Sequence, residues 1–352
     1  MTRALVIGAG INGLCAAWAL ARSGASVAVL EARETPNPLG ASHDRHRLIR
    51  RHYPGRPDLA AAIDQAFAAW DRLWADLGHA HYVETGVLAV SREAGDWADR
   101  AREAFAGTAI ERDELDAERA VERFPFLRPG GIRHAVHTPD GGALLADRIL
   151  DGLVGHLKQR GVEVRAHAPV ERVDAETGTI RLANGGREQG DVVVCAANLG
   201  NAALGVPSLD TVPMRSMMLY VEPPPDVSGR YANMPSWVDL GGADDHWGIA
   251  PVAGLPMKIG LGSMTRRNDA FEDRGVTDAE ADAILASYGE RFVGLERATI
   301  VRRAANFYAM APGEEHRIAR HGRAVVADLC SGHGFKFGAL RGERVAQIAL
   351  AC

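Results

Sequence analysis

Cysteine is scarce in this sequence, and the four cysteines, Cys15, Cys195, Cys330 and Cys352, show neither a CxxC pair nor the spacing of metal ligands. This argues against a disulfide scaffold and against a metal site, and reduced thiols in a cytoplasmic protein are the simplest interpretation. An excess of positive charge is also missing, because the net charge is −5; nothing general points to a nucleic acid partner. Long apolar runs are lacking too, and the first one, residues 4–7, is far too short for a membrane span or a signal peptide.

The composition is that of a packed enzyme-sized protein. With 352 residues, 47% of them hydrophobic, the chain fits two domains or one large composite domain, and its interior has ample room for a dinucleotide. Short Val-, Ile- and Leu-rich segments alternate with helical patterns, which predicts an α/β fold with a parallel sheet flanked by helices. The expected strands are residues 4–7, 26–30, 161–164 and 191–196, and the expected helices are residues 12–23 and 147–160.

Two other stretches differ in character. Residues 85–139 and 210–304 carry most of the prolines and show alternating patterns typical of antiparallel strands. We expect them to form an inserted antiparallel-sheet domain of the α+β kind that binds substrate. The nucleotide-binding domain would then be discontinuous, assembled from residues 1–84, 140–209 and 305–352.

A glycine-rich turn follows the first expected strand. Gly8, Gly10 and Gly13 form the pattern G-x-G-x-x-G, in which the first glycine permits the turn, the second admits a pyrophosphate and the third lets helix and strand pack closely. The helix N-terminus offers free N–H groups to the phosphates. Glu31 ends the second strand, where it can accept hydrogen bonds from a ribose diol. The unit predicts a Rossmann-like dinucleotide site and does not distinguish between FAD and NAD.

A dense group of cations occupies residues 40–53, which read G-A-S-H-D-R-H-R-L-I-R-R-H-Y. A solvated basic face, or a site for an acidic partner, would explain them. If the segment is helical, Arg47 and Arg50 share a face. Two guanidiniums directed into one cavity would suit a carboxylate, because the arginine fork binds it bidentately. The residues alone leave these alternatives open.

The glycine turn, the basic segment and residues 331–337, S-G-H-G-F-K-F, together resemble the monomeric sarcosine oxidase and N-methyltryptophan oxidase group of the D-amino-acid oxidase-like flavoenzymes. The resemblance runs over nearly the whole chain, and the S-G-H-G-F-K-F turn is its most specific element. It implies FAD as cofactor, a Rossmann-like FAD-binding domain and a small anionic amine as substrate, such as an alpha-amino or N-alkyl amino acid. It also implies that O2 is reduced to H2O2.

The same resemblance implies roles for three cations. Arg50 and Lys336 would hold the carboxylate of the substrate and so orient its amine over the flavin. Lys258, among the apolar neighbours of L-P-M-K-I-G, would assist the reaction with O2 through its positive charge. Without the resemblance, Lys336 would be read as a solvent-facing lysine and Lys258 as a structural lysine whose ammonium reaches water.

Weaker matches concern the surroundings of the flavin and the substrate. Arg47 and His43 would lie near the flavin ring, where they would tune its charge or relay protons, and Trp247 and Tyr308 would line the substrate cavity. The residues expected to bind the cofactor are Gly8, Gly10, Ile11, Asn12, Gly13, Glu31, Ala32, Arg33, Ser42, His43, Arg47, Val170, Ala197, Gly332, His333, Gly334, Phe335 and Lys336.

Two departures from the family pattern affect the expectation. Members with covalently attached flavin have a cysteine two residues before the tyrosine that matches Tyr308, and this chain has Asn306 there. We therefore expect non-covalent FAD. The histidine that follows the oxygen-reactive lysine by four residues is replaced by Gly262, which puts a sarcosine-like substrate in doubt but not the reaction class.

Other functions share parts of this pattern. A flavin-dependent amino-acid dehydrogenase would pass its electrons to an acceptor other than O2, an NAD-dependent opine-type dehydrogenase would share the glycine turn, and a flavin-binding protein without activity would share both. For the oxidase, the expected partners are an anionic amine and O2, with no nucleic acid and no membrane. We expect a cytoplasmic monomer or small homo-oligomer.

Overall fold

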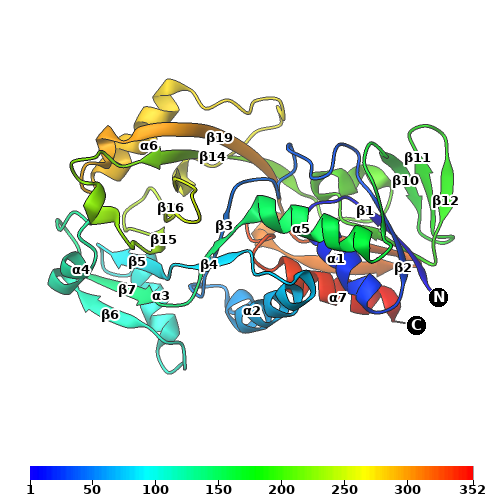
Figure 1. Ribbon diagram of the computed structural model, residues 1–352, viewed down its shortest axis with the longest axis horizontal. Helices are drawn as coiled ribbons and strands as arrows, with labels where there is room; N and C mark the ends of the chain where they lie inside the picture. The colour runs from blue at the N-terminus through cyan, green and yellow to red at the C-terminus, as the bar shows by residue number, and fades with distance from the viewer. Residues whose placement is uncertain (352) are drawn as a thin grey trace.

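The computed structural model describes residues 1–351, and its strands gather into two large sheets at opposite ends of an elongated molecule (Figure 1). The first sheet has the strand order β20-β21-β13-β1-β2-β9, and its neighbours are parallel except for β20, which runs antiparallel to β21 at the edge. Its central strands are almost wholly buried, as expected for a parallel sheet covered on both faces. The strands are β1 (Arg3–Ile7), β2 (Ser26–Leu30), β9 (Glu163–Arg165), β13 (Val192–Cys195), β20 (Arg317–His321) and β21 (Ala324–Asp328).

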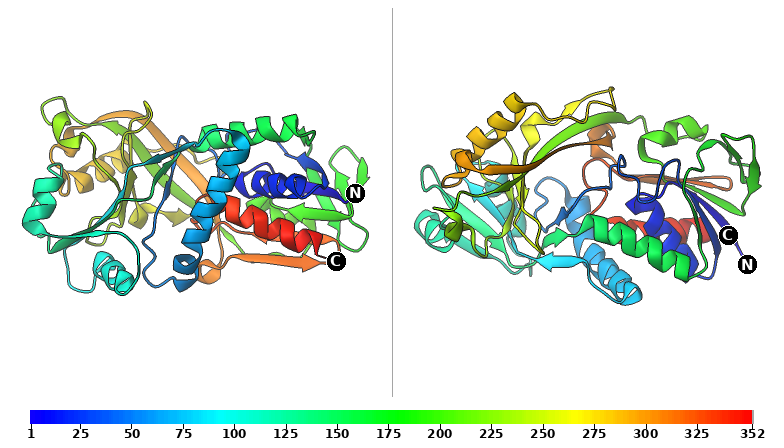
Figure 2. Two further views of the ribbon diagram at one scale, coloured as in Figure 1. Left: turned by 60° about the horizontal axis from the view of Figure 1, so that its bottom comes forward. Right: turned by 45° about the horizontal axis from the view of Figure 1, so that its top comes forward.

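Helices cover one face of this sheet, and a small antiparallel sheet covers the other. α1 packs against both α5 and α7, and α2 packs against α5 and α7 (Figure 2). Gly342 of α7 permits the close approach to α1, since a Cβ atom there would lie 2.4 Å from the backbone carbon of Cys15. The elements are α1 (Ile11–Arg22), α2 (Pro57–Leu77), α5 (Ala146–Gln159), α7 (Gly338–Leu350), β10 (Val170–Asp174), β11 (Thr179–Leu182) and β12 (Arg187–Gln189).

The second sheet has the order β18-β14-β17-β16-β15-β5-β7-β6, with β19 paired to β14. Its neighbours are antiparallel except for the parallel pair β15 and β5. The longest strands, β14 (Val212–Glu222) and β19 (Thr299–Met310), pair over their whole length and reach back toward the first sheet. The other strands are β5 (Val87–Ser91), β6 (Asp113–Asp116), β7 (His134–Thr138), β15 (Ser236–Asp239), β16 (His246–Ile249), β17 (Met257–Leu261) and β18 (Arg266–Arg267), and the helices on this sheet are α3 (Trp97–Phe105), α4 (Ala117–Arg123) and α6 (Asp278–Gly289).

The α/β fold expected from the sequence is confirmed, and the first strand-helix-strand unit lies within a residue of its expected bounds. The strand expected at residues 161–164 begins two residues later, at Glu163. The division into domains remains an expectation, and the boundary placed after residue 304 falls inside β19. None of the helices within residues 1–351 is both long and apolar enough to cross a lipid bilayer.

The basic segment contains a strand where a helix was considered. Residues 47–49 form β3 (Arg47–Ile49), which pairs with β8 (Gly142–Leu144); β4 (Tyr82–Glu84) pairs with the other edge of β8. Glycine makes this arrangement possible, because Gly142 has φ +145° and a Cβ atom there would lie 2.4 Å from the carbonyl oxygen of Val83. The pairing partner is distant in sequence, so local pattern could not reveal it.

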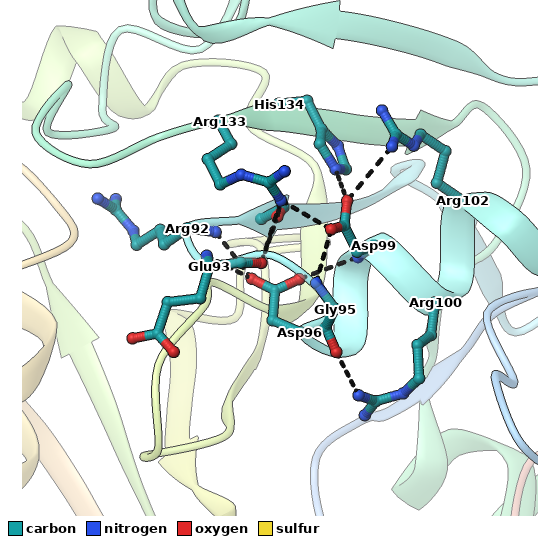
Figure 3. Close-up of polar contacts among 10 residues, drawn as sticks. Arg92, Glu93, Gly95, Asp96, Asp99, Arg100, Arg102, Arg133 and His134 are labelled. Atoms are coloured by element: carbon teal, nitrogen blue, oxygen red, sulfur yellow. Dashed lines mark hydrogen bonds and ion pairs between the residues drawn. The ribbon is translucent and has the colours of Figure 1, made fainter.

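A polar network fastens the N-terminus of α3 to the second sheet (Figure 3). The Asp99 carboxylate accepts hydrogen bonds from the Gly95 amide at 2.8 Å and from Arg133 Nη1 at 2.7 Å, and it lies 2.5 Å from His134 Nε2. Asp96 caps the helix by accepting the N–H of Asp99 at 2.9 Å. The network fixes the start of α3, where Trp97 stands.

Candidate active site

A cavity of about 960 Å³ lies between the two sheets and is lined by residues of both. It begins at the carboxyl ends of β1 and β2, where parallel sheets bind their ligands. All of the expected site residues except Gly13 line it: Gly8, Gly10, Ile11, Asn12, Glu31, Ala32, Arg33, Ser42, His43, Arg47, Arg50, Val170, Ala197, Trp247, Lys258, Tyr308, Gly332, His333, Gly334, Phe335 and Lys336. Segments that are remote in sequence therefore meet around one volume.

The glycine turn has the geometry expected for a phosphate site. Gly8 has φ +99°, which L side chains rarely adopt. Gly13 is outside the cavity because it packs helix against strand: a Cβ atom there would lie 1.9 Å from the carbonyl oxygen of Gly8. The N–H of Ile11 donates to Ser42 Oγ at 2.9 Å. The N-terminus of α1 thus points into the cavity, as a pyrophosphate requires.

Glu31 and Asn12 supply the polar groups around this turn. One Glu31 carboxylate oxygen accepts the N–H of Ala9 at 2.8 Å, and the other accepts Asn37 Nδ2 at 3.1 Å and the N–H of Arg33 at 3.2 Å. The oxygen that accepts only the Ala9 N–H keeps a second lone pair for a ligand hydroxyl. Asn12 Oδ1 is buried without a hydrogen-bond partner within residues 1–351, which fits a site that a polar ligand completes.

Arg50 presents a cation to the cavity without an opposing carboxylate. Its guanidinium lies 4.6 Å from the Tyr53 ring centroid and 5.4 Å from that of Trp97, and one nitrogen donates to the His52 carbonyl. No ion pair to Arg50 occurs among the residues that the structure describes. Burial lowers the pKa of Arg50, opposed by Tyr53 and Asp245; an arginine nevertheless stays charged. The two aromatic rings hold the guanidinium in place for an anion.

Lys336 lies beside this arginine and is equally free of an acidic partner within residues 1–351. Its Nζ is 3.5 Å from His333 Nδ1, and His333 Nε2 is 3.4 Å from the Glu314 carboxylate. Burial, reinforced by the charge of Arg50, lowers the pKa of Lys336 well below its usual value. Burial likewise lowers the pKa of His333, to about 3. Because Arg50 disfavours the charge of Lys336, a bound anion would stabilise both cations.

Lys258 of β17 is buried and forms an ion pair with Asp44. Its Nζ also donates to the His46 carbonyl at 3.0 Å and lies 5.5 Å from the centroid of the Trp247 ring. Burial lowers the pKa of Lys258 to about 8, although Asp44 opposes that shift. Burial alone would raise the pKa of Asp44, but Lys258 and Arg47 hold it far below its usual range. The pair is therefore ionised at neutral pH.

Lysine occurs only three times in the sequence, as Lys158, Lys258 and Lys336. Two of the three line this cavity, whereas arginine supplies nearly all the other cations of the chain. An ammonium is a compact point charge that can lose its proton when it is buried. A guanidinium is planar and stays charged in proteins.

Several residues of the site were not expected from the sequence. Asp44 accepts hydrogen bonds from Lys258, Arg47 and the Tyr220 hydroxyl, and it was visible only as the single acid among the cations of the basic segment. Asp245 also lines the cavity, from the turn before β16. Within residues 1–351, no group of His, Cys, Asp and Glu side chains could hold a metal ion.

The positions expected near a flavin ring also line the cavity. Arg47 donates to the Ala41 carbonyl at 3.0 Å in addition to its pair with Asp44, and burial lowers the pKa of His43. Burial raises the pKa of Tyr308 to about 12, so its hydroxyl stays protonated. The roles assigned to these residues stay predictions.

A turn of this kind, on a parallel sheet and beside a cavity with uncompensated cations, defines a dinucleotide-dependent enzyme. The family described as FAD dependent oxidoreductase (DAO) matches residues 3–348, and the chain belongs to that family. Its cofactor is accordingly FAD, which fits the glycine turn, the Glu31 carboxylate and the unpartnered Asn12 oxygen. The chain is a flavoprotein oxidoreductase.

Individual relatives agree with this assignment. A monomeric sarcosine oxidase of Bacillus sp. (strain NS-129) is 24% identical over 98% of this chain and 92% of that protein. An N-methyl-L-tryptophan oxidase of Salmonella arizonae is 24% identical over 98% and 94%. Among solved structures, L-proline dehydrogenase from P. horikoshii has a TM-score of 0.85 at 18% identity, covering 99% of this chain and 93% of that one. NikD, an amino acid oxidase of nikkomycin biosynthesis, has a TM-score of 0.83 at 20% identity, covering 99% and 94%.

Proposed function

We propose that the protein is an FAD-dependent oxidase of a small anionic amine, an alpha-amino or N-alkyl amino acid, with O2 as electron acceptor. The observation that supports this most strongly is the meeting of Arg50, Lys258 and Lys336 around one cavity that also contains the glycine turn. The two cations without carboxylate partners suit the acid group of the substrate. The third cation, held in a buried pair, suits the reaction with O2.

Arg50 and Lys336 would bind the substrate carboxylate and so hold its amine and alpha carbon in one orientation. A bound anion would also restore the charge of Lys336, whose pKa is low in the free protein because of burial and the neighbouring Arg50. A phosphonate or sulfonate would satisfy the same pair of cations. FAD, held by the glycine turn and Glu31, would supply the acceptor for a hydride from the C–N carbon; the two electrons would go on to O2 to give hydrogen peroxide, and water would hydrolyse the imine product.

Lys258 would stabilise the negative charge that develops on O2, since a positive charge in a buried site acts strongly on a neighbouring anion. Its burial excludes water from around the ammonium. Asp44 keeps the ammonium protonated up to a pH near its pKa of about 8. In this proposal the residues that bind the substrate carboxylate, Arg50 and Lys336, belong to different segments of the chain from Lys258, which acts on O2.

The FAD would be held without a covalent bond. Asn306, which stands where covalent members have cysteine, lines the cavity and donates from Nδ2 to the His43 carbonyl at 3.3 Å. Cys330 also lines the cavity, but burial raises the pKa of its thiol, so little of the nucleophilic thiolate is present. We also propose that residues 85–139 and 210–304 form the substrate-binding part and the remaining segments the FAD-binding part.

The test uses the purified protein with its own flavin. We expect a yellow protein whose colour is bleached anaerobically by at least one member of a panel of amino and N-methyl amino acids, and which forms peroxide with that amine in air. Replacement of Lys336 with Met should weaken binding of the amine about 10²-fold, as loss of a charge-assisted bond does. Lys158→Met, on the exposed side of α5, is the matched control and should change nothing.

The outcomes separate the candidate functions. A colourless protein active with NAD would contradict the proposal. Bleaching by an amine without peroxide formation in air would replace the oxidase with a dehydrogenase that uses another acceptor. Flavin that no amine bleaches would indicate a protein without this activity.

A further inference from the structure

Two glycines, Gly260 in β17 and Gly262 just after it, leave the backbone bare opposite Trp247 and Asp245. Trp247 pairs with Gly260 in the antiparallel register, and one step further the N–H of Gly262 donates to the Asp245 carbonyl at 2.8 Å. A Cβ atom at Gly260 would lie 2.3 Å from the Trp247 ring, and one at Gly262 would lie 1.9 Å from Asp245 Oδ2. The side chains of Trp247 and Asp245 therefore lie across the bare backbone of Gly260 and Gly262.

Asp245 has an uncommon backbone conformation. Its φ is +50°, in the left-handed region that Asp and Asn adopt more readily than other side chains. The residue lies in the turn between β15 and β16, where it is exposed and contributes to the lining of the cavity. The place that a side chain at position 262 would fill is thus occupied by a carboxylate.

This carboxylate has no protein partner. Within residues 1–351, no hydrogen-bond donor or cation lies within bonding distance of either oxygen of Asp245. The neighbouring Asp244, in contrast, accepts the Ser287 hydroxyl at 2.5 Å. Burial raises the pKa of Asp245, and the charge of Arg50 opposes that shift without a direct contact. A carboxylate that lines a ligand cavity without a donor is available to a donor on the ligand.

We propose that Asp245 is a specificity-determining residue that binds a second cationic nitrogen of the substrate, distinct from the amine that is oxidised. This rests on the proposed function, because Arg50 and Lys336 hold the acid group there. The reacting amine must be neutral to lose a hydride from its carbon, and a carboxylate beside it would stabilise its protonated form. The nitrogen that Asp245 binds is therefore a different one. The substrate class is an anionic amine with an additional ammonium or guanidinium group.

The experiment compares substrates that differ only in that second charge. The probes are 2,4-diaminobutyrate and 2-aminobutyrate, each as both enantiomers, and the readout is the anaerobic rate of flavin reduction against probe concentration. The natural chain should favour the diamino acid. Asp245→Asn keeps the size and the tolerance of positive φ, and it should lower the rate constant over Kd for the diamino acid about 10- to 100-fold. The monoamino acid should change less than about threefold.

Two further variants make the comparison decisive. Gly262→Ala should displace the carboxylate through its added methyl group and cause the same selective loss, since Gly262 has no positive φ to forbid alanine. Asp244→Asn removes the same charge from the same turn outside the cavity and should leave both probes unchanged. Equal losses for both probes in Asp245→Asn, or no preference in the natural chain, would overturn the assignment of Asp245. If neither probe nor any other amine reduces the flavin, the proposed function itself fails.

Discussion

Replacing Asp44 with Asn removes the carboxylate that keeps Lys258 charged. This change should slow the reaction of the reduced flavin with O2 and leave reduction of the flavin by the amine unaffected. Asp44 and Lys258 are both almost completely buried, with 2% of each residue exposed. At an effective dielectric constant of about 20, two charges roughly 4 Å apart attract by about 4 kcal/mol. Loss of that attraction corresponds to a fall of about three in the pKa of Lys258. From a starting pKa of about 8, the lysine becomes neutral at pH 7.

The neutral amine can no longer stabilise a developing anion. Loss of one such group typically costs about 10²- to 10³-fold in rate, so reoxidation of the reduced flavin should slow by that factor at pH 7. In the natural chain the rate should fall as the pH rises through about 8, since Lys258 loses its proton there. In the variant this fall should be absent between pH 6 and pH 10, because Lys258 is already neutral there: burial and the cations Arg47 and Arg302 still lower its pKa, and Asp44 no longer opposes them.

The assay mixes substrate-reduced protein with oxygenated buffer in a stopped-flow instrument between pH 6 and pH 10. Anaerobic reduction by the amine serves as the control and should change less than about threefold. Because removal of one partner of a buried pair can cost 3 to about 5 kcal/mol of stability, thermal unfolding is measured in parallel. The double variant Asp44→Asn with Lys258→Met should reoxidise no more slowly than Lys258→Met. A folded Asp44→Asn protein that reoxidises at the natural rate at pH 7 would refute the reasoning.

Three further predictions follow from the site and its supports. Lys258→Met should slow flavin reoxidation by orders of magnitude and spare anaerobic reduction; equal reoxidation rates would remove this lysine from the mechanism. Acid precipitation should release all yellow colour into the supernatant, and colour retained in the pellet would point to a bond with Cys330, which lines the cavity. Asp99→Ala should lower the free energy of unfolding by about 1–2 kcal/mol, because Arg133 and His134 lose their shared acceptor. Denaturant titration measures this, and an unchanged midpoint would contradict it.

The parts of the fold that depend on local pattern could be predicted from the sequence. The strand at residues 26–30 has the expected bounds, because Gly24 before the apolar run and Glu31 after it mark where the strand begins and ends. The third glycine of the turn also acts as expected, because close packing of helix on strand depends on that one position. Such features involve neighbours in sequence.

Features that depend on pairing between distant segments could not be predicted. The strand Arg47–Ile49 forms because β8 lies beside it, almost one hundred residues later in the chain. Likewise, Asp245 enters the cavity because the register places it opposite Gly262, and no local pattern reveals a register. The resemblance to flavoenzymes predicted Arg50 and Lys336 as ligands of a carboxylate, but a family pattern could not predict Asp245, which reaches the cavity from the turn before β16.

The long ladder between β14 and β19 bears on how small molecules would reach the cavity. The two strands pair from Val212 with Met310 to Glu222 with Thr299, with one irregularity beside Tyr220. A hinge between the two ends of the molecule would have to break a series of backbone hydrogen bonds, at about 1 kcal/mol each. We therefore expect access through loops: Phe271 and Arg274 line the cavity, and Arg274 reaches across to the Leu39 carbonyl at 2.9 Å. We expect the opening of this loop contact, rather than a rotation of the two ends of the molecule, to limit the exchange of small molecules.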